Sequence, residues 1–232
     1  MKKISAVAAI AITAGCWALP AAATTVLYRN DLNLGTDQMA AALSALGLSV
    51  TTTSGDLSSF TLSDFNLVVY FSQNLGSPPG DTAALNSYIA GGGKVIYDNF
   101  DGNAAEVPTG VGGYTGNINL TSLTVGSQFD AGLTTNPLTL SNPGWGVFSY
   151  GETGSVTAGT FENGDAGIII GNGGRTIFDG FLADTLDSTD GPTLYENEIR
   201  SLTAAVPEPA SVALLGSALA GFGWLRRRRR KS

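Results

Sequence analysis

The sequence predicts a single exported α/β domain built on a mostly parallel β-sheet. Three observations lead to this fold class. Between residues 24 and 98, short apolar runs alternate with segments of helical periodicity, as they do when helices connect parallel strands. Residues 67–71 form a continuous apolar run, which is typical of a strand buried on both faces. Near the end of the domain, Gly-Asn-Gly-Gly at 171–174 separates two apolar runs and predicts a late antiparallel hairpin.

The individual elements follow in chain order. Strands are expected at 25–28, 48–53, 67–71 and 94–97, and the hairpin strands at 166–170 and 176–181. A first helix is expected after Thr36 as its N-cap, with Asp37 in its first turn. A second helix begins near Asp81 and ends at the glycines 91–93, and the last helix follows Pro192, with Asp190 as its cap. Residues 162–165 suggest a turn.

Residues 99–160 differ in composition from the rest of the domain. They are rich in Gly, Thr, Ser and Asn, and no helical pattern stands out. We expect an irregular β and loop insertion there, with short strands such as 146–150.

The N-terminus has the pattern of a secretory signal peptide. Lys2 and Lys3 precede an apolar stretch, and three alanines at 21–23 supply a cleavage site, so residues 1–23 are expected to be removed. The alternatives are a retained membrane helix or a lipid-modified Cys16, although Thr13 stands where a lipoprotein signal has a large aliphatic residue.

The C-terminus carries a second signal, at residues 206–232. Val206, Pro207, Glu208 and Pro209 are followed by an uncharged apolar stretch at 210–225 and then by six consecutive basic residues. As a helix, the apolar stretch would span ~24 Å, and the basic tail would hold its end in the cytoplasm. We therefore expect a single transmembrane helix at 210–225, with the exported domain at 24–205.

This order of elements resembles the PEP-CTERM sorting signal. The resemblance implies processing by an exosortase-type enzyme in a Gram-negative host that makes exopolysaccharide. It also implies anchoring in the membrane through the C-terminal helix before processing, and then a place at the cell surface or in the extracellular matrix of a biofilm. The alternative is an ordinary C-terminal anchor with a basic stop-transfer sequence.

Charge and composition narrow the function further. Residues 24–205 contain four basic and eighteen acidic side chains, a net formal charge of −14. Such a domain should repel nucleic acid, so no nucleic-acid partner is expected. It could attract divalent cations, and Ca²⁺ is a candidate ligand; no other cofactor is expected.

The segment 85–96, a helix followed by three glycines and a strand, is similar to class I glutamine amidotransferase-like domains, including the ThuA-like proteins. The hairpin at 171–175 adds to the resemblance, which implies a flavodoxin-like three-layer sandwich. Those amidotransferases use a Cys nucleophile and a His. Here Cys16 is the only cysteine and there is no histidine, which excludes thiol catalysis and His-based triads in the mature domain.

Polar residues follow the predicted parallel strands. Ligands of open parallel sheets bind beyond the carboxyl ends of the strands. The candidate residues there are Asn30, Asp31, Ser72, Gln73, Asn74, Asp98, Asn99 and Asp101. Their carboxylates and amides suit a carbohydrate or a Ca²⁺ ion, although loop ends are polar in most proteins.

Three functions remain open. We expect a non-catalytic surface domain that binds polysaccharide or another surface component. One alternative is a glycan hydrolase in which Asp98 or Asp101, with Asp31, acts as acid and base, which needs two carboxylates ~5–10 Å apart. The other is a Ca²⁺-dependent adhesive or structural module.

Overall fold

The structure is a computed structural model that describes residues 24–31, 36–74, 76–99, 108, 113–117, 119–141, 148–151 and 155–203. The predicted signal peptide, the sorting motif at 206–209 and the predicted transmembrane helix at 210–225 lie outside these residues. Within them, no helix is both long and apolar enough to span a membrane.

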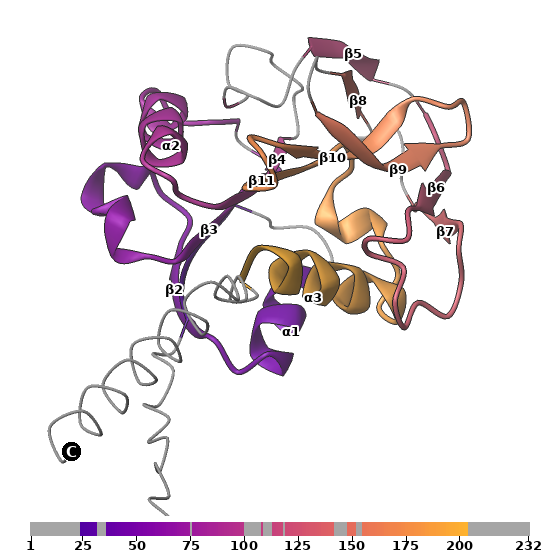
Figure 1. Cartoon of the computed structure of the whole chain (residues 1–232), viewed down its shortest axis with the longest axis horizontal. Helices are drawn as coiled ribbons and strands as arrows, with labels where there is room; N and C mark the ends of the chain where they lie inside the picture. The colour runs from indigo at the N-terminus through magenta and orange to yellow at the C-terminus, as the bar shows by residue number, and fades with distance from the viewer. Residues whose placement is uncertain are drawn as a thin grey trace, which may run out of the picture.

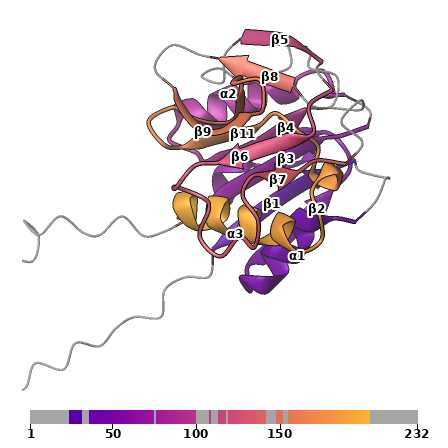
Figure 2. The same ribbon diagram turned by 90° about the vertical axis from the view of Figure 1, so that its right-hand side faces the viewer.

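In the described part of the chain, a main sheet of nine strands forms the centre of the domain, in the order β2-β1-β3-β4-β11-β10-β9-β6-β7. Figure 1 labels all of these strands except β1, which is labelled in Figure 2. Two further strands, β5 and β8, form a small antiparallel sheet. The strands are β1 Thr25–Asn30, β2 Ser49–Thr53, β3 Leu67–Ser72, β4 Val95–Asn99, β5 Gly113–Asn117, β6 Ser122–Val125, β7 Leu138–Thr139, β8 Phe148–Gly151, β9 Val156–Phe161, β10 Ala166–Gly171 and β11 Thr176–Asp179.

The main sheet is mixed rather than mostly parallel. Five neighbouring strands pair in parallel, in the order β2, β1, β3, β4 and β11. The apolar runs between residues 24 and 98 predicted a parallel arrangement for the first four of them. Beyond β11 every pairing is antiparallel, through β10, β9, β6 and β7. The predicted hairpin is confirmed as β10 and β11. The expectation of a mostly parallel sheet was wrong because β6, β7 and β9, from the region taken as an insertion, extend the same sheet.

Helices cover both faces of the sheet, as Figures 1 and 2 show. Helices α1 (Gln38–Ala45) and α3 (Asp190–Thr203) pack side by side on one face. Helix α2 (Asp81–Ala90) covers the other, together with two 3₁₀ turns, η1 (Leu57–Ser59) and η2 (Leu62–Asp64). Each face has its own buried apolar cluster, so the described residues form helix, sheet and helix layers.

Two predicted helix caps are wrong. The N-cap of α1 is Asp37 rather than Thr36, and its carboxylate accepts from Ala40 N at 2.8 Å. Helix α3 begins at Asp190, before Pro192. The Asp190 carboxylate accepts hydrogen bonds from the backbone and hydroxyl groups of Thr134 and Thr135. Asp190 therefore ties a long-range loop to the start of α3.

Candidate functional site

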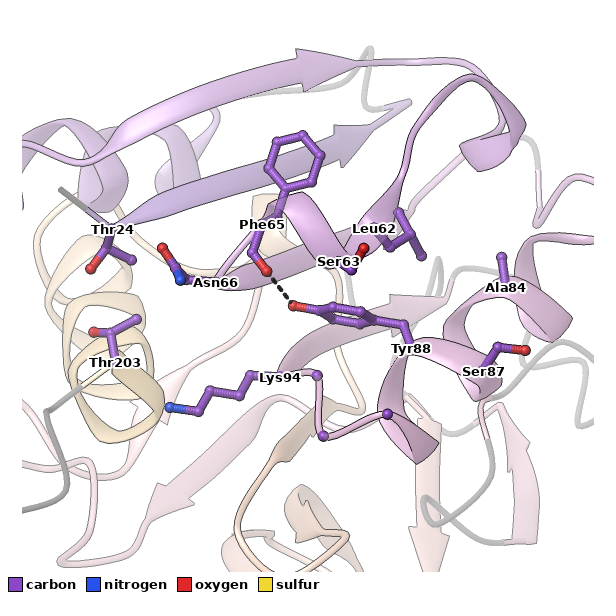
Figure 3. A pocket seen from close by; sticks show the side chains of 13 residues that line it. Thr24, Leu62, Ser63, Phe65, Asn66, Ala84, Ser87, Tyr88, Lys94 and Thr203 are labelled. Carbon is purple, nitrogen blue, oxygen red and sulfur yellow. Dashed lines mark hydrogen bonds between the residues drawn. The ribbon is translucent and has the colours of Figure 1, made fainter. Parts of the chain in front are cut away.

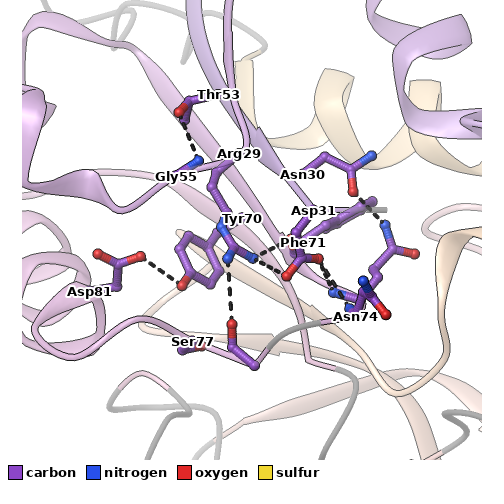
Figure 4. Close-up of polar contacts among 12 residues, drawn as sticks. Arg29, Asn30, Asp31, Thr53, Gly55, Tyr70, Phe71, Asn74, Ser77 and Asp81 are labelled. Carbon is purple, nitrogen blue, oxygen red and sulfur yellow. Dashed lines mark hydrogen bonds and ion pairs between the residues drawn. The ribbon is translucent and has the colours of Figure 1, made fainter. Parts of the chain in front are cut away.

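The carboxyl edge of the parallel strands contains the reversal point of the sheet. The chain leaves β1 towards β2 and then returns to form β3 on the other side of β1. The segments after β1 and β3 therefore diverge and leave room for a ligand between them. Asn30 and Asp31, at the end of β1, come together with Gln73 and Asn74, which follow β3 (Figure 4).

Hydrogen bonds join the polar residues of the carboxyl edge. Asp31 Oδ1 accepts from the backbone N–H groups of Gln73 at 2.6 Å and Asn74 at 3.1 Å. Asn30 Oδ1 accepts from Gln73 Nε2 at 3.0 Å, and Gln73 Oε1 accepts from Ala183 N at 2.9 Å. These bonds tie three distant segments of the chain into one framework.

Arg29 supports this framework from inside the protein. Its Nη1 lies 3.2 Å from Asp31 Oδ2 and donates to Phe71 O at 2.7 Å. The guanidinium carbon lies 4.8 Å from the centre of the Tyr70 ring, within range of a cation–π interaction. Arg29 is only 1% exposed. Sequence reasoning missed it because a lone arginine in an apolar strand gives no motif.

The structure brings together only some of the predicted site residues. Asp31 and Gln73 meet Asn30 and Asn74, whereas Ser72 is fully buried. Asp98 is also buried, at 1% exposure. Because side chains alternate along a strand, it lies on the face that packs against α3. Asn99 ends β4, but its side chain lies outside the described residues, as does the whole of Asp101.

Beneath α3, the same half of the sheet holds a buried carboxyl group that the sequence did not reveal. Asp179 of β11 is the register neighbour of Asp98 on β4. It faces Glu198 of α3, and both are almost completely buried. Among the described residues, no other group donates a hydrogen bond to either carboxyl. When one of the two carboxyl groups is protonated, its O–H group can therefore donate a hydrogen bond to the other.

Both members of this pair titrate far from their ordinary ranges. Burial raises the pKa of Asp179 to about 8, while its hydrogen bond with Glu198 acts in the opposite direction. Burial, together with the charge and hydrogen bond of Asp179, raises the pKa of Glu198 well above its usual value. The pair is therefore largely protonated at neutral pH.

A helical signal could have revealed Glu198. It lies four residues after Leu194 and four before Leu202, on the buried stripe of α3. An acidic residue at a core position of an amphipathic helix indicates a special environment. The two strands have similar sequences, because Asp179 directly follows Thr-Ile-Phe and Asp98 directly follows Val-Ile-Tyr. Pairing the two strands at equivalent positions would therefore have placed the two aspartates side by side.

A metal centre is not apparent among the described residues. No three of their His, Cys, Asp or Glu side chains lie together in a way that could hold a metal ion. Since Asp101 lies outside the described residues, Ca²⁺ binding stays a prediction.

Comparison with known proteins identifies the C-terminal signal. Residues 205–229 match the family model described as the PEP-CTERM protein-sorting motif. The chain therefore carries an exosortase sorting signal, which indicates export, anchoring in the membrane and cleavage by exosortase. No curated protein sequence matches the chain.

Solved structures show what the fold of the domain is similar to. A protein of Thermoplasma acidophilum, described as one subunit of GMP synthase, aligns with a TM-score of 0.57 at 12% identity, over 79% of this chain and 96% of its own. A glutamine amidotransferase of Thermotoga maritima aligns with a TM-score of 0.54 at 9% identity, over 79% and 100%. An α-L-fucosidase of Paenibacillus thiaminolyticus aligns with a TM-score of 0.51 at 12% identity, over 78% of this chain but 33% of the enzyme. The fold is thus glutamine amidotransferase-like.

Proposed function

We propose that this exosortase-sorted protein is a non-catalytic surface protein, whose domain binds polysaccharide of the host's own surface at the carboxyl edge of β1 and β3. One observation carries the proposal: Asn30, Asp31, Gln73 and Asn74 converge at the reversal point of the sheet. Amide and carboxylate groups suit a sugar, because its hydroxyl groups both donate and accept hydrogen bonds.

The residues of the carboxyl edge divide into a framework and a rim. Gln73 and Asp31 are buried, at 1% and 7% exposure, and their polar atoms hold neighbouring segments. Asn30 belongs to the same framework, because its Nδ2 donates to Tyr28 Oη at 2.6 Å and to Asp37 Oδ2 at 3.0 Å. The half-buried Asn74 forms the rim. The framework would hold the Asn74 amide in position, which reduces the entropy lost when a ligand binds.

The geometry supports binding better than acid–base hydrolysis by Asp31 and Asp98. Asp31 is paired with Arg29 and accepts two backbone hydrogen bonds, so it is engaged as an anion in the framework. Asp98 is buried on the face covered by α3. A hydrolase needs an acid and a base that both reach the same glycosidic bond.

Replacing Asn74 by alanine is expected to weaken polysaccharide binding about tenfold, the equivalent of one lost hydrogen bond. The measurement is calorimetric titration of the full chain, in detergent, with exopolysaccharide purified from the host. The matched control is Gln128→Ala, which removes an exposed amide from the distant loop after β6. Equal affinity for Asn74→Ala and Gln128→Ala, or no binding by the natural chain, would contradict the proposed function.

A further inference from the structure

A groove opens at the opposite, amino edge of the parallel strands. It has a volume of about 750 Å³ and lies between α2, the turn η2 and the end of α3 (Figure 3). Its centre is the ring of Tyr88, whose hydroxyl donates to Phe65 O at 2.9 Å. The ring lies directly against Gly93, where even a Cβ atom would come within 2.5 Å of it. The groove therefore presents an aromatic surface bordered by glycine backbone.

Both ends of the described domain meet at this groove. Thr24 and Thr203, the first and last residues of the described domain, are both among its lining residues. The Lys94 ammonium group donates a hydrogen bond to Leu202 O and so holds the end of α3 beside the start of β4. The Pro-Glu-Pro segment begins four residues beyond Thr203, which is a reach of at most ~14 Å.

The charge at the groove is opposite to that of the domain. Among its lining residues, all of which are described, Lys94 is a cation and none is an anion. Arg175 adjoins it, with Nη1 bonded to Ile89 O at the end of α2. These are two of only four basic residues between 24 and 205. The single acidic residue of the sorting motif, Glu208, would complement them.

We propose that the groove at the amino edge binds the chain's own sorting motif, residues 206–209. The two prolines would pack against the Tyr88 ring, as proline-rich segments pack in aromatic grooves, and Glu208 would face Lys94 and Arg175. The site exists only when α2, η2 and α3 have assembled. The folded domain would therefore hold the motif at its own surface while the chain is anchored, and the processing enzyme would have to displace it.

Disulfide trapping tests this proposal, because the chain has no cysteine after residue 16. The full chain, purified in detergent before any processing, carries Cys16→Ser to remove its one natural thiol. It also carries Ala210→Cys together with Ser63→Cys, an exposed groove residue. The matched control pairs Ala210→Cys with Ser49→Cys, an exposed serine beside Thr24 that does not line the groove. A disulfide forms readily only when the two Cα atoms come within ~7 Å.

We expect the Ser63 pair to link within one molecule at least tenfold faster than the Ser49 pair under mild oxidation. Adding Glu208→Gln should reduce this preference severalfold. Thermal melts of the reduced variants show whether each is folded. Equal rates for the two pairs would overturn the proposal, because they indicate a tail without a preferred site. Links formed only between molecules would also overturn it, in favour of the groove binding the tail of a second copy.

Discussion

Replacing Glu198 by glutamine is expected to stabilise the protein at pH 8 by roughly 3 kcal/mol and to change its stability little at pH 4. The physical reason is the buried pair that Glu198 forms with Asp179. Both have raised pKa values, so the folded state binds more protons than the unfolded state above about pH 4. Stability from the protonated pair is complete below the unfolded pKa and is lost as the pH rises towards about 8. Glutamine imitates the protonated acid and does not titrate.

Urea unfolding of the full chain in detergent, at several pH values from 4 to 9, measures this effect. The control is Glu196→Gln, two residues away on the same helix, where the side chain is partly exposed and pairs with Arg200. That pair should contribute less than ~0.5 kcal/mol. If Glu198→Gln and Glu196→Gln gave the same change at every pH, the Asp179–Glu198 pair would not be held protonated.

Replacing Arg29 by methionine is expected to destabilise the fold by about 4 kcal/mol, because it leaves the buried Asp31 carboxylate without its charged partner. The substitution also removes the hydrogen bond to Phe71 O and the contact with the Tyr70 ring. Since Arg29 supports both segments of the carboxyl edge, polysaccharide affinity should fall as well.

Arg200→Met is the matched comparison, since Arg200 also pairs with an acidic residue but at 62% side-chain exposure. It should cost less than ~0.5 kcal/mol. Urea unfolding at pH 6 compares the two variants. A loss for Arg29→Met as small as that for Arg200→Met would mean that Asp31 is stabilised by its two backbone hydrogen bonds alone.

The parallel half of the fold could be predicted because its strands are apolar throughout. The strand β3 is buried along its whole length, and a continuous apolar run of this length is typical of a strand with both faces covered. In β6, buried and more exposed residues alternate, and the strand is four residues long. A short alternating pattern among Gly and Thr residues resembles a loop, so residues 99–160 were expected to be irregular, although the hairpin of β10 and β11 was predicted.

The candidate site could be predicted in part for the same reason. The positions of Asp31 and Gln73 follow from two well-defined strand ends. The burial of Asp98 does not, because it depends on α3, whose residues follow it by about a hundred positions. Glu198 and Asp179 were likewise invisible as a pair, since only the packing of α3 against the sheet brings Glu198 onto Asp179 at the end of β11.

Backbone amide exchange, followed by mass spectrometry, tests the central claim most directly. The full chain is compared in detergent with and without exopolysaccharide from its host. Binding at the carboxyl edge should slow exchange in segments 29–37 and 72–80, because a ligand suppresses local opening where it binds. Slower exchange confined to segments 62–66 and 84–94 at the amino edge, or no change anywhere, would contradict a polysaccharide site at the reversal point of the sheet.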